Sequence, residues 1–295
     1  MVLRFSADGI LDTDFGPVGS GGVVTPAYGP ENNVASGVAL QNDGRIVVAG
    51  SASNADGTVV RFGLARLDAQ GMLDTTFNST GSVPGTLVDP FADGNRVGKD
   101  LARTDDGKIV VVGRDTTSSK SVIAVARYLQ NGQPDVTFGQ DGWKLIDFGE
   151  SIDDANDIEN QDDGRVVVLG RLKVEAEARA VLARLDIDGS LDQTFGDGGR
   201  IVTALALPES RFRGVDGLVT EESGSLVIAG KTIGSAPAVL RLLAGRRDDL
   251  EALSLLRSLK HIDLQVACGE GDQYLRQKSL WKRQGRNGGH VVCPR

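Results

Sequence analysis

Arginine and aspartate recur together at a fixed spacing, and such a pair could form a charged site or a structural ion pair. The pairs are Arg66 with Asp74, Arg127 with Asp135, and Arg184 with Asp192. The same pair returns in every copy of a longer pattern, and a buried arginine needs an acidic partner. We therefore predict an ion pair that braces a turn rather than a catalytic or binding site.

The segment from Asp186 to Asp192, DIDGSLD, resembles a calcium loop, because alternating carboxylates can converge on a hard cation. The equivalent segments weaken this interpretation, since one carries Asp68 and Gln70 and another carries Leu129 and Asn131. No twelve-residue EF-hand loop with its terminal glutamate follows. An Asx-type turn is the better prediction.

The remaining chemical groups form no recognisable site. The four residues His261, His290, Cys268 and Cys293 lack the CxxC or HxxxH spacing of a zinc site, and no repeat serine has a recurring histidine partner. Glycine-rich segments such as Gly19–Gly22 precede strands rather than helices, so they are not phosphate cradles. We predict no metal, no cofactor and no catalytic residue, and hence a protein that is not an enzyme.

Charge and hydropathy exclude two classes of partner. The chain of 295 residues has a formal net charge of −8, and its last 52 residues are basic while the rest is acidic. An acidic body argues against binding a nucleic-acid backbone. No segment approaches the roughly 18 consecutive apolar residues that span a bilayer, and the first residues contain no apolar core of signal-peptide length. We expect neither nucleic-acid binding nor membrane insertion.

Two alternating signatures reveal an internal repeat. The first ends in phenylalanine, as in ARLDAQGMLDTTF from Ala65, and its phenylalanines Phe15, Phe77, Phe138 and Phe195 are 62, 61 and 57 residues apart. The second is a turn followed by an apolar strand, as in TDDGKIVVVG from Thr104, and its glycines Gly44, Gly107, Gly164 and Gly224 are 63, 57 and 60 residues apart. The agreement of the two spacings establishes a repeat of about 60 residues.

Each repeat is predicted to contain four short antiparallel strands. In the example of residues 95–148 they are Arg96–Arg103, Lys108–Gly113, Ser121–Tyr128 and Trp143–Phe148. Asp-Gly between two β-rich runs favours a hairpin, and the continuously apolar second strand indicates burial on both faces. This pattern predicts an all-β fold, a β-propeller of four-stranded blades, in preference to a β-sandwich or a parallel β-helix.

The repeat segments resemble the delta-60 repeat family of bacterial tandem-repeat proteins, which contain "LARL…DGSLDTTFG" and "DGKIVVAG" segments. The resemblance covers about Leu3 to Leu243. It implies a propeller-like protein that is secreted or located at the cell surface and generally has no assigned activity. It implies no catalytic residues.

The repeat pattern predicts two regions. Residues 1–243 hold three complete units with partial units at each end, and the partial units could complete one another or belong to a longer array. Residues 244–295 form an irregular tail, in which Asp248–Leu264 has the leucine spacing and the charge distribution of a helix. The tail is either a natural appendage or the product of a frameshift.

A comparison of the copies suggests where a ligand could bind. The loops that join second to third strands, and one unit to the next, differ between copies, and in a propeller both sets lie on one face. The candidate residues at or beside these loops are Arg114, Asp153, Asp154, Glu209 and Arg213. Our main hypothesis is a non-enzymatic scaffold that binds a protein or a glycan there. The alternatives are a carbohydrate-active hydrolase with carboxylates at the channel mouth, and a truncated product without independent function.

Overall fold

The computed structural model describes residues 1–29, 32–91, 94–117, 120–149, 153–174, 177–203, 212–221, 223–232 and 237–242. The chain divides into two units, Met1–Leu250 and Glu251–Arg295, and every described residue belongs to the first. The predicted helix at Asp248–Leu264 lies outside the described residues. The predicted boundary after residue 243 stays a prediction.

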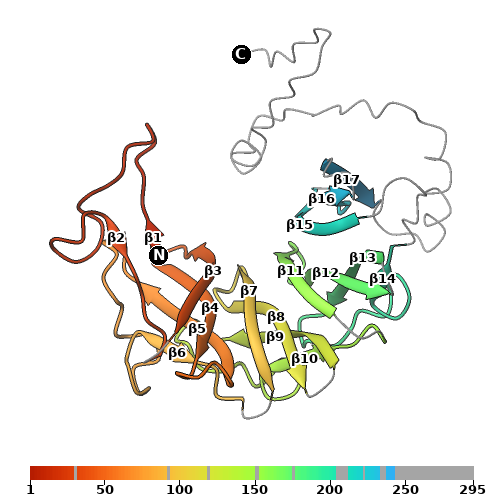
Figure 1. Ribbon diagram of the computed structural model, residues 1–295, viewed down its shortest axis with the longest axis horizontal. Helices are drawn as coiled ribbons and strands as arrows, with labels where there is room; N and C mark the ends of the chain where they lie inside the picture. The colour runs from red at the N-terminus through yellow and green to blue at the C-terminus, as the bar shows by residue number, and fades with distance from the viewer. Residues whose placement is uncertain are drawn as a thin grey trace, which may run out of the picture. The chain divides into compact units, whose positions relative to one another are not determined.

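The first half of the chain forms a small ribbon and two complete four-stranded sheets (Figure 1). Strands β1 (Val2–Leu3) and β2 (Val23–Val24) pair with each other. The first blade contains β3 (Asn33–Leu40), β4 (Ile46–Ser53), β5 (Val60–Leu67) and β6 (Thr86–Val88). The second contains β7 (Asn95–Arg103), β8 (Ile109–Thr117), β9 (Lys120–Tyr128) and β10 (Trp143–Ile146). All of these strands pair antiparallel to their neighbours.

The second half repeats the same order of strands. The third blade contains β11 (Asp153–Asn160), β12 (Val166–Val174), β13 (Glu177–Leu185) and β14 (Arg200–Val202). The fourth contains β15 (Phe212–Thr220), β16 (Leu226–Thr232) and β17 (Pro237–Leu242). A single residue pair, Ala178 with Phe212, joins these two blades into one sheet. The described part of the chain is thus all-β and consists of β-propeller blades, as the repeat predicts.

Hairpins connect the first two strands of each blade, and glycine is required in them. Gly44, Gly107, Gly164 and Gly224 have φ of 82°, 83°, 83° and 79°. An L-residue with a side chain rarely adopts this backbone conformation, whereas glycine does so without steric cost. The recurring glycine of the second sequence signature is therefore explained by the turn geometry.

The second strand of each blade lies in the middle of the core. Val110 and Val112 of β8 pack with the third blade, while Ile109 and Val111 of the same strand pack with the first blade. All four side chains are at most 1% exposed. Burial on both faces explains why these strands are continuously apolar instead of alternating. Each blade is consequently held between its neighbours by apolar contacts.

The recurring arginine, aspartate and phenylalanine link each unit to the next. The Nε atom of Arg127 donates to Asp135 Oδ2 at 2.7 Å, and its guanidinium lies 4.5 Å from the ring centroid of Phe138. The Nη1 atom of Arg127 donates to the carbonyl of Ile187 in the following unit. Arg66 makes the same set of contacts with Asp74, Phe77 and the carbonyl of Gln130. The predicted structural ion pair is confirmed, and it also connects successive blades.

The described residues contain strands and turns and no helix. Accordingly, none of them forms a helix that is long and apolar enough to cross a bilayer.

Candidate functional site

The structure places the residues singled out from the sequence on strands rather than in loops. Arg114 lies within β8, which runs on to Thr117 instead of ending at Gly113, and Asp153 and Asp154 open β11. Arg213 belongs to β15, although its side chain is outside the described part of the chain, as is that of Asp153. Glu209 lies outside the described residues altogether. Arg114 and Asp154 are therefore the two candidates whose side chains can be placed.

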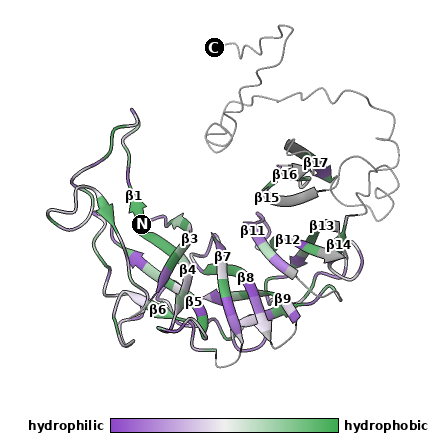
Figure 2. Ribbon diagram, viewed as in Figure 1, coloured by the Kyte–Doolittle hydropathy of each residue, from purple (hydrophilic) through white to green (hydrophobic). Residues whose placement is uncertain are grey.

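The first strands of the blades form the frame of the site. Strand β7 contacts both β3 and β11, and β11 in turn contacts β15, so we call β3, β7, β11 and β15 the inner strands. Among them β11, with the sequence DDANDIEN, is largely hydrophilic and drawn mostly in purple in Figure 2. Polar side chains on contacting inner strands are thereby brought close to one another.

A β-bulge in each of β7 and β11 displaces one residue from the regular ladder. The bulged residues are Lys99, between Gly98 and Asp100, and Asn156, between Ala155 and Asp157. A bulge re-aims side chains. The same bulge occurs in β3 and β15, between Ala35 and Gly37 and between Val215 and Gly217, so it is a feature of every blade. The Nζ atom of Lys99 lies 3.8 Å from Asp154 Oδ2, which joins the two strands by an ion pair. The Lys99 side chain is 35% exposed, so the ion pair borders solvent.

Arg114 approaches the same part of β11. In the first blade, Ser51 occupies the corresponding register position, and its hydroxyl accepts a hydrogen bond of 2.9 Å from the amide of Gly98 on the next inner strand. Strand β8 contacts β11, so the same relationship brings Arg114 to the region around Ala155. The Nε atom of Arg114 is buried and has no hydrogen-bond partner in the structure.

Two acceptors beside this arginine are also unsatisfied. Asp154 Oδ1 and Asn156 Oδ1 are buried and accept no hydrogen bond in the described structure. An unpaired buried polar atom is costly, and each one calls for an explanation in terms of function, solvent or ligand. Buried polar atoms of this kind occur elsewhere in the described structure as well, for example at Gln41 and Thr220, so they support a site here only together with the charged groups around them.

A pair of carboxyl groups lies next to these residues. Asp100 of β7 and Asp157 of β11 are hydrogen-bonded to each other through their side chains. Burial raises the pKa of Asp100 to about 8, and the hydrogen bond and the charge of Asp157 act in the same direction. A carboxyl–carboxyl hydrogen bond requires a proton between two groups that cannot both be ionised. Asp100 is therefore a carboxylic acid at neutral pH.

Asp157 also has a structural role. Its Oδ1 accepts from the amide of Ile158 at 2.9 Å, and its Oδ2 accepts from the amide of Leu218 in β15 at 2.6 Å. The residue is 7% exposed, whereas Asp100 is only partly buried. Asp100 makes matching contacts, because it accepts hydrogen bonds from the backbone of Leu101 and of Ile158 in β11. Both residues therefore join inner strands, and Asp100 is the more exposed of the two.

We call this group of residues the β7–β11 cluster. It consists of Lys99, Asp100, Arg114, Asp154, Asn156 and Asp157. Sequence reasoning found Arg114 and Asp154 and missed the other four. An alignment of the inner strands would have revealed the acid pair, because the positions that match Asp100 and Asp157 are Gly37 and Gly217 in the outer two blades.

A second charged group lies near the first two blades but is closed to solvent. Arg96 lies 2.9 Å from Asp115 and 3.5 Å from Asp89 through its nitrogen atoms, and it stacks over the Trp143 ring at 4.7 Å. Arg96, Asp89 and Asp115 are at most 4% exposed. Burial raises the pKa of Asp89 to about 6. No substrate can reach these groups, so we assign them to the core.

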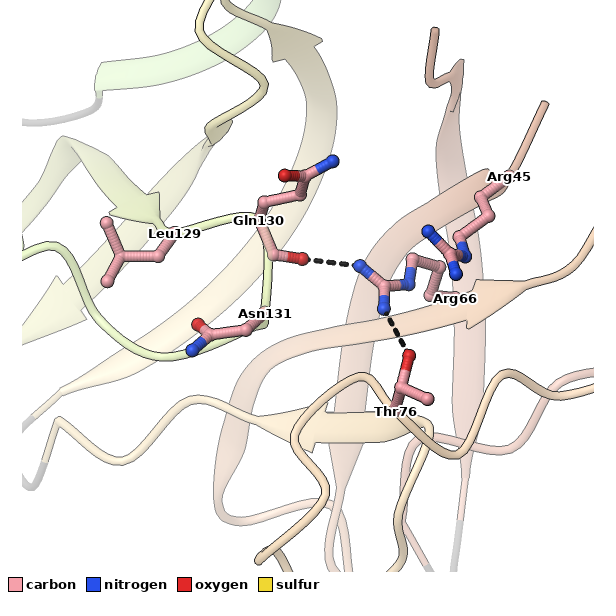
Figure 3. Close-up of a pocket in the computed structure, with 6 residues that line it drawn as sticks. All are labelled: Arg45, Arg66, Thr76, Leu129, Gln130 and Asn131. Atoms are coloured by element: carbon pink, nitrogen blue, oxygen red, sulfur yellow. Dashed lines mark hydrogen bonds between the residues drawn. The ribbon is translucent and has the colours of Figure 1, made fainter. Parts of the chain in front are cut away.

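An open pocket of about 430 Å³ lies between the turns of the first two blades (Figure 3). It is lined by Arg45, Arg66, Thr76, Leu129, Gln130 and Asn131. Arg66 faces the pocket, but it already donates to Asp74, to the hydroxyl of Thr76 at 2.9 Å and to the carbonyl of Gln130. The pocket is therefore lined by the recurring arginine–aspartate contact that connects successive blades. The guanidinium of Arg66 is already engaged in that contact and is not available to bind a ligand.

The structure offers no metal centre in the part that it describes, since no group of three histidine, cysteine, aspartate or glutamate residues there could hold an ion. Asp186 binds Arg165 at 2.8 Å, and Asp188 accepts from the Ser190 amide at 2.8 Å. The predicted Asx-type turn at this position is thus observed.

Comparisons with known proteins agree with the fold. Residues 41–77, 104–138 and 161–195 match the family described as a domain of unknown function (DUF5122) β-propeller. These three segments coincide with the repeat found in the sequence, and the chain is a β-propeller repeat protein. No curated protein matches the chain.

Solved structures with a similar arrangement include enzymes that act on carbohydrates. A polysaccharide lyase has 16% identity and a TM-score of 0.44 over 71% of this chain and 57% of its own length. A thermostable family-43 glycoside hydrolase has 13% identity and a TM-score of 0.37, over 71% of this chain and 73% of its own. A glycosyl hydrolase from Bacteroides ovatus has 15% identity and a TM-score of 0.33, over 73% and 68%. This chain thus spans little more than half of the lyase.

These comparisons correct two predictions. The hypothesis of a non-enzymatic binding scaffold, and with it the expectation that the protein is not an enzyme, is contradicted because the matching structures are enzymes. The alternative of a carbohydrate-active hydrolase agrees better. At these TM-scores the likeness carries no activity over to this chain, so a function must be argued from its own residues.

Proposed function

We propose that this protein hydrolyses glycosidic bonds with carboxyl groups of the β7–β11 cluster. The observation that carries the proposal is the hydrogen-bonded pair of Asp100 and Asp157 on contacting inner strands, with Asp100 protonated at neutral pH. Glycoside hydrolysis requires one carboxyl group that is protonated and a second that is ionised. A raised pKa is the means by which enzymes keep the acid protonated near pH 7.

Asp100 is the general acid in this proposal, and Asp157 is a positioning residue that keeps it protonated. Asp154 is the second carboxylate in this proposal, because its ion pair with Lys99 at 3.8 Å suits an ionised group. The residue is 8% exposed, so Lys99 has to move before a sugar or a water molecule reaches the carboxylate. Asp154 acts either on the sugar directly or by activating a water molecule. The two acids lie on contacting strands, as a reaction on a single bond requires.

Arg114, Asn156 and Lys99 bind the substrate. The Nε atom of Arg114 and Asn156 Oδ1 are buried, so in this proposal they bind a sugar hydroxyl, as donor and as acceptor, only after neighbouring side chains move. A hydroxyl group both donates and accepts, so a sugar satisfies unpaired donors and acceptors together. The side chain of Lys99 is partly exposed and flexible, so it can move aside to admit a sugar to Asp154. This role for the bulged lysine explains why it borders the site.

Two further features are proposed from the repeat segments. We propose that the repeats are of the delta-60 type, on the basis of ARLDIDGSLDQTF from Ala183 and TDDGKIVVVG from Thr104. The same resemblance supports a location outside the cell or at its surface, where a polysaccharide would be the natural substrate.

The test is a screen of the purified full-length protein for release of reducing sugar from polysaccharides and of chromophore from aryl glycosides. Asp100→Asn keeps the size of the side chain and its capacity to donate a hydrogen bond, but it cannot transfer a proton. We expect it to lower turnover by at least about 100-fold, the usual contribution of a general acid. Asp154→Asn should lower turnover as well.

Asp105→Asn is the matched control, because Asp105 is an exposed aspartate of the β7–β8 hairpin, away from the β7–β11 cluster. It should keep the wild-type rate. Equal rates in wild type, Asp100→Asn and Asp154→Asn, or no product from any glycoside, would overturn the proposal.

A further inference from the structure

One matching position of the inner strands is buried in three blades and exposed in the first. It holds Val38, Leu101, Ile158 and Leu218, which pair with the second strand in the same register. Leu101, Ile158 and Leu218 are 6%, 4% and 0% exposed, whereas Val38 is 62% exposed. An apolar side chain at this position is therefore buried in the second, third and fourth blades and exposed to solvent in the first.

The covering partner in the other blades is the preceding blade. Leu101 packs with Val47, Ala49 and Leu64 of the first blade, and it lies so close to Gly37 that a Cβ there would come within 2.6 Å of it. Ile158 packs likewise with Val112 and other side chains of the second blade. We call the side that carries Val38, Leu101, Ile158 and Leu218 the leading face of a blade. The opposite side is its trailing face.

The trailing face of the last blade is open as well. Val239 of β17 occupies the register position of Leu64, Val125 and Leu182. These three residues are 0% exposed because the next blade covers them, but Val239 is 48% exposed. Ala229, which pairs with Val239, is also exposed, while its equivalents Ala49, Val112 and Leu169 are buried. Within the described residues, one face of each kind is thus left open.

Strands β1 and β2 cover only the outer part of the first leading face. Phe15, Val24 and Tyr28 pack there against Val48 and Leu67 of β4 and β5. The part over β3 stays open, where Val38 and Leu40, which pair with Val48 and Ile46, are 62% and 67% exposed. A cluster of exposed apolar side chains of this kind marks an interaction surface.

We propose that the trailing face of the last blade binds the leading face of the first blade of a second copy. The contact would continue the blade-to-blade interface that the chain builds three times within itself, with Val239 in the role of Leu64 and Val38 in the role of Leu101. Two different faces that complement each other form a head-to-tail contact, which yields rings or filaments rather than a two-fold dimer.

The arrangement of outer strands fits this contact. The sequence Val-Leu-Arg occurs at Val2–Arg4, which begins with β1, and at Val239–Arg241 within β17, so both strands correspond to the third strand of a blade. A docked last blade supplies β15, β16 and β17, and β2 can serve as its fourth strand. The two-residue strand β1 then gives way to β17.

The test uses two charge variants of the full-length protein, Val38→Glu and Val239→Glu, and measures molar mass by light scattering after gel filtration. A charge buried in an apolar contact is strongly unfavourable, so each variant alone should show a dissociation constant raised at least about tenfold. Wild type should form larger species with rising concentration.

A mixture of the two variants is diagnostic. Each variant keeps one intact face, so the mixture should form a dimer and nothing larger. Val136→Glu is the matched control, because Val136 is 69% exposed in a turn outside both faces, and this variant should associate like wild type.

A wild type that stays monomeric at all concentrations would overturn the proposal, and closure of the ring within one chain would then cover Val38. Association that is unchanged in Val38→Glu, or a mixture that stays monomeric, would overturn it equally.

Discussion

The carboxyl group of Asp100 lies directly against Gly37 of the neighbouring inner strand. A Cβ atom on residue 37 would come within 2.7 Å of Asp100 Oδ1 and within 2.6 Å of Leu101 Cδ2. The absence of a side chain at residue 37 is therefore a condition for the position of the proposed acid. The first blade contributes to the site because Gly37 leaves room for the side chain of Asp100.

Gly37→Ala should accordingly affect both stability and turnover. The added methyl group must displace Asp100 or Leu101, and overpacking of this kind costs about 1–3 kcal/mol. Gly29→Ala is the control, since its nearest neighbour would be a side-chain methyl of Val88 at 3.4 Å. Chemical denaturation measures the free energy of unfolding. A Gly37→Ala protein with wild-type stability and turnover would show that the close approach has no consequence.

Stability should fall as the pH is raised toward the pKa of Asp100. The folded protein raises this pKa from 3.8 to about 8, so above the ordinary value the folded state binds more protons than the unfolded state. Folding is then progressively disfavoured as the pH rises from about 4 to about 8. Asp89, with a folded pKa of about 6, contributes in the same direction at the lower end of this range.

The variant Asp100→Asn distinguishes the contribution of Asp100 to the pH dependence of stability from that of Asp89. Above about pH 7 Asp89 is ionised in both states, so the remaining decrease in melting temperature belongs to the Asp100–Asp157 pair. The variant should lose that decrease, and calorimetry between about pH 7 and pH 9 measures it. An identical slope in wild type and Asp100→Asn would contradict the raised pKa.

The recurring ion pair of arginine and aspartate, which also contacts the next blade, should contribute strongly to the free energy of unfolding. Arg127→Ala removes the guanidinium paired with Asp135 at 2.7 Å, in a pair whose side chains are both 4% exposed, and leaves Asp135 with the ammonium group of Lys108 at 3.3 Å. Removing one partner of a buried pair costs about 3–5 kcal/mol. Lys120→Ala, which breaks an exposed pair with Asp147, should cost no more than about 1 kcal/mol. Equal losses of stability in denaturant titrations would refute the structural role of the recurring ion pair.

Much of the fold can be predicted from the sequence because its determinants are local and repeated. Gly107 with its positive φ specifies a hairpin, Ile109 to Val112 specify a strand buried on both faces, and Phe138 anchors the turn below Arg127. Each of these features returns about every 60 residues. Consistency between copies makes the pattern readable without a structure.

The site could be predicted only in part. Arg114 and Asp154 were found because they lie at or beside loops that differ between copies, and the structure includes both residues in strands, β8 and β11. The contact of Asp100 with Asp157 depends on bulges at Lys99 and Asn156. The same bulge recurs in β3 and β15, where glycine occupies the matching position, and the contact joins residues of different blades. Local patterns cannot reveal such a contact.

Phe138→Ala tests whether the recurring phenylalanine is an anchor of the hydrophobic core. The ring is fully buried beside the third blade, and removal of a buried aromatic side chain costs about 3–5 kcal/mol. Val136→Ala, two residues earlier and exposed, should change stability by no more than about 0.5 kcal/mol. If Phe138→Ala unfolds at the same denaturant concentration as wild type, the recurring phenylalanine is not an anchor.

The pH dependence of turnover tests the central claim most directly. With the glycoside that the wild-type protein cleaves fastest, kcat/KM should be highest near neutrality and should fall on the alkaline side as Asp100 loses its proton, near the pKa of about 8. Asp105→Asn should give the same curve, and Asp100→Asn should remove both the activity and its alkaline limb. A rate that stays constant through this pH range, or a curve that Asp100→Asn leaves unchanged, would contradict the assignment of Asp100 as the acid.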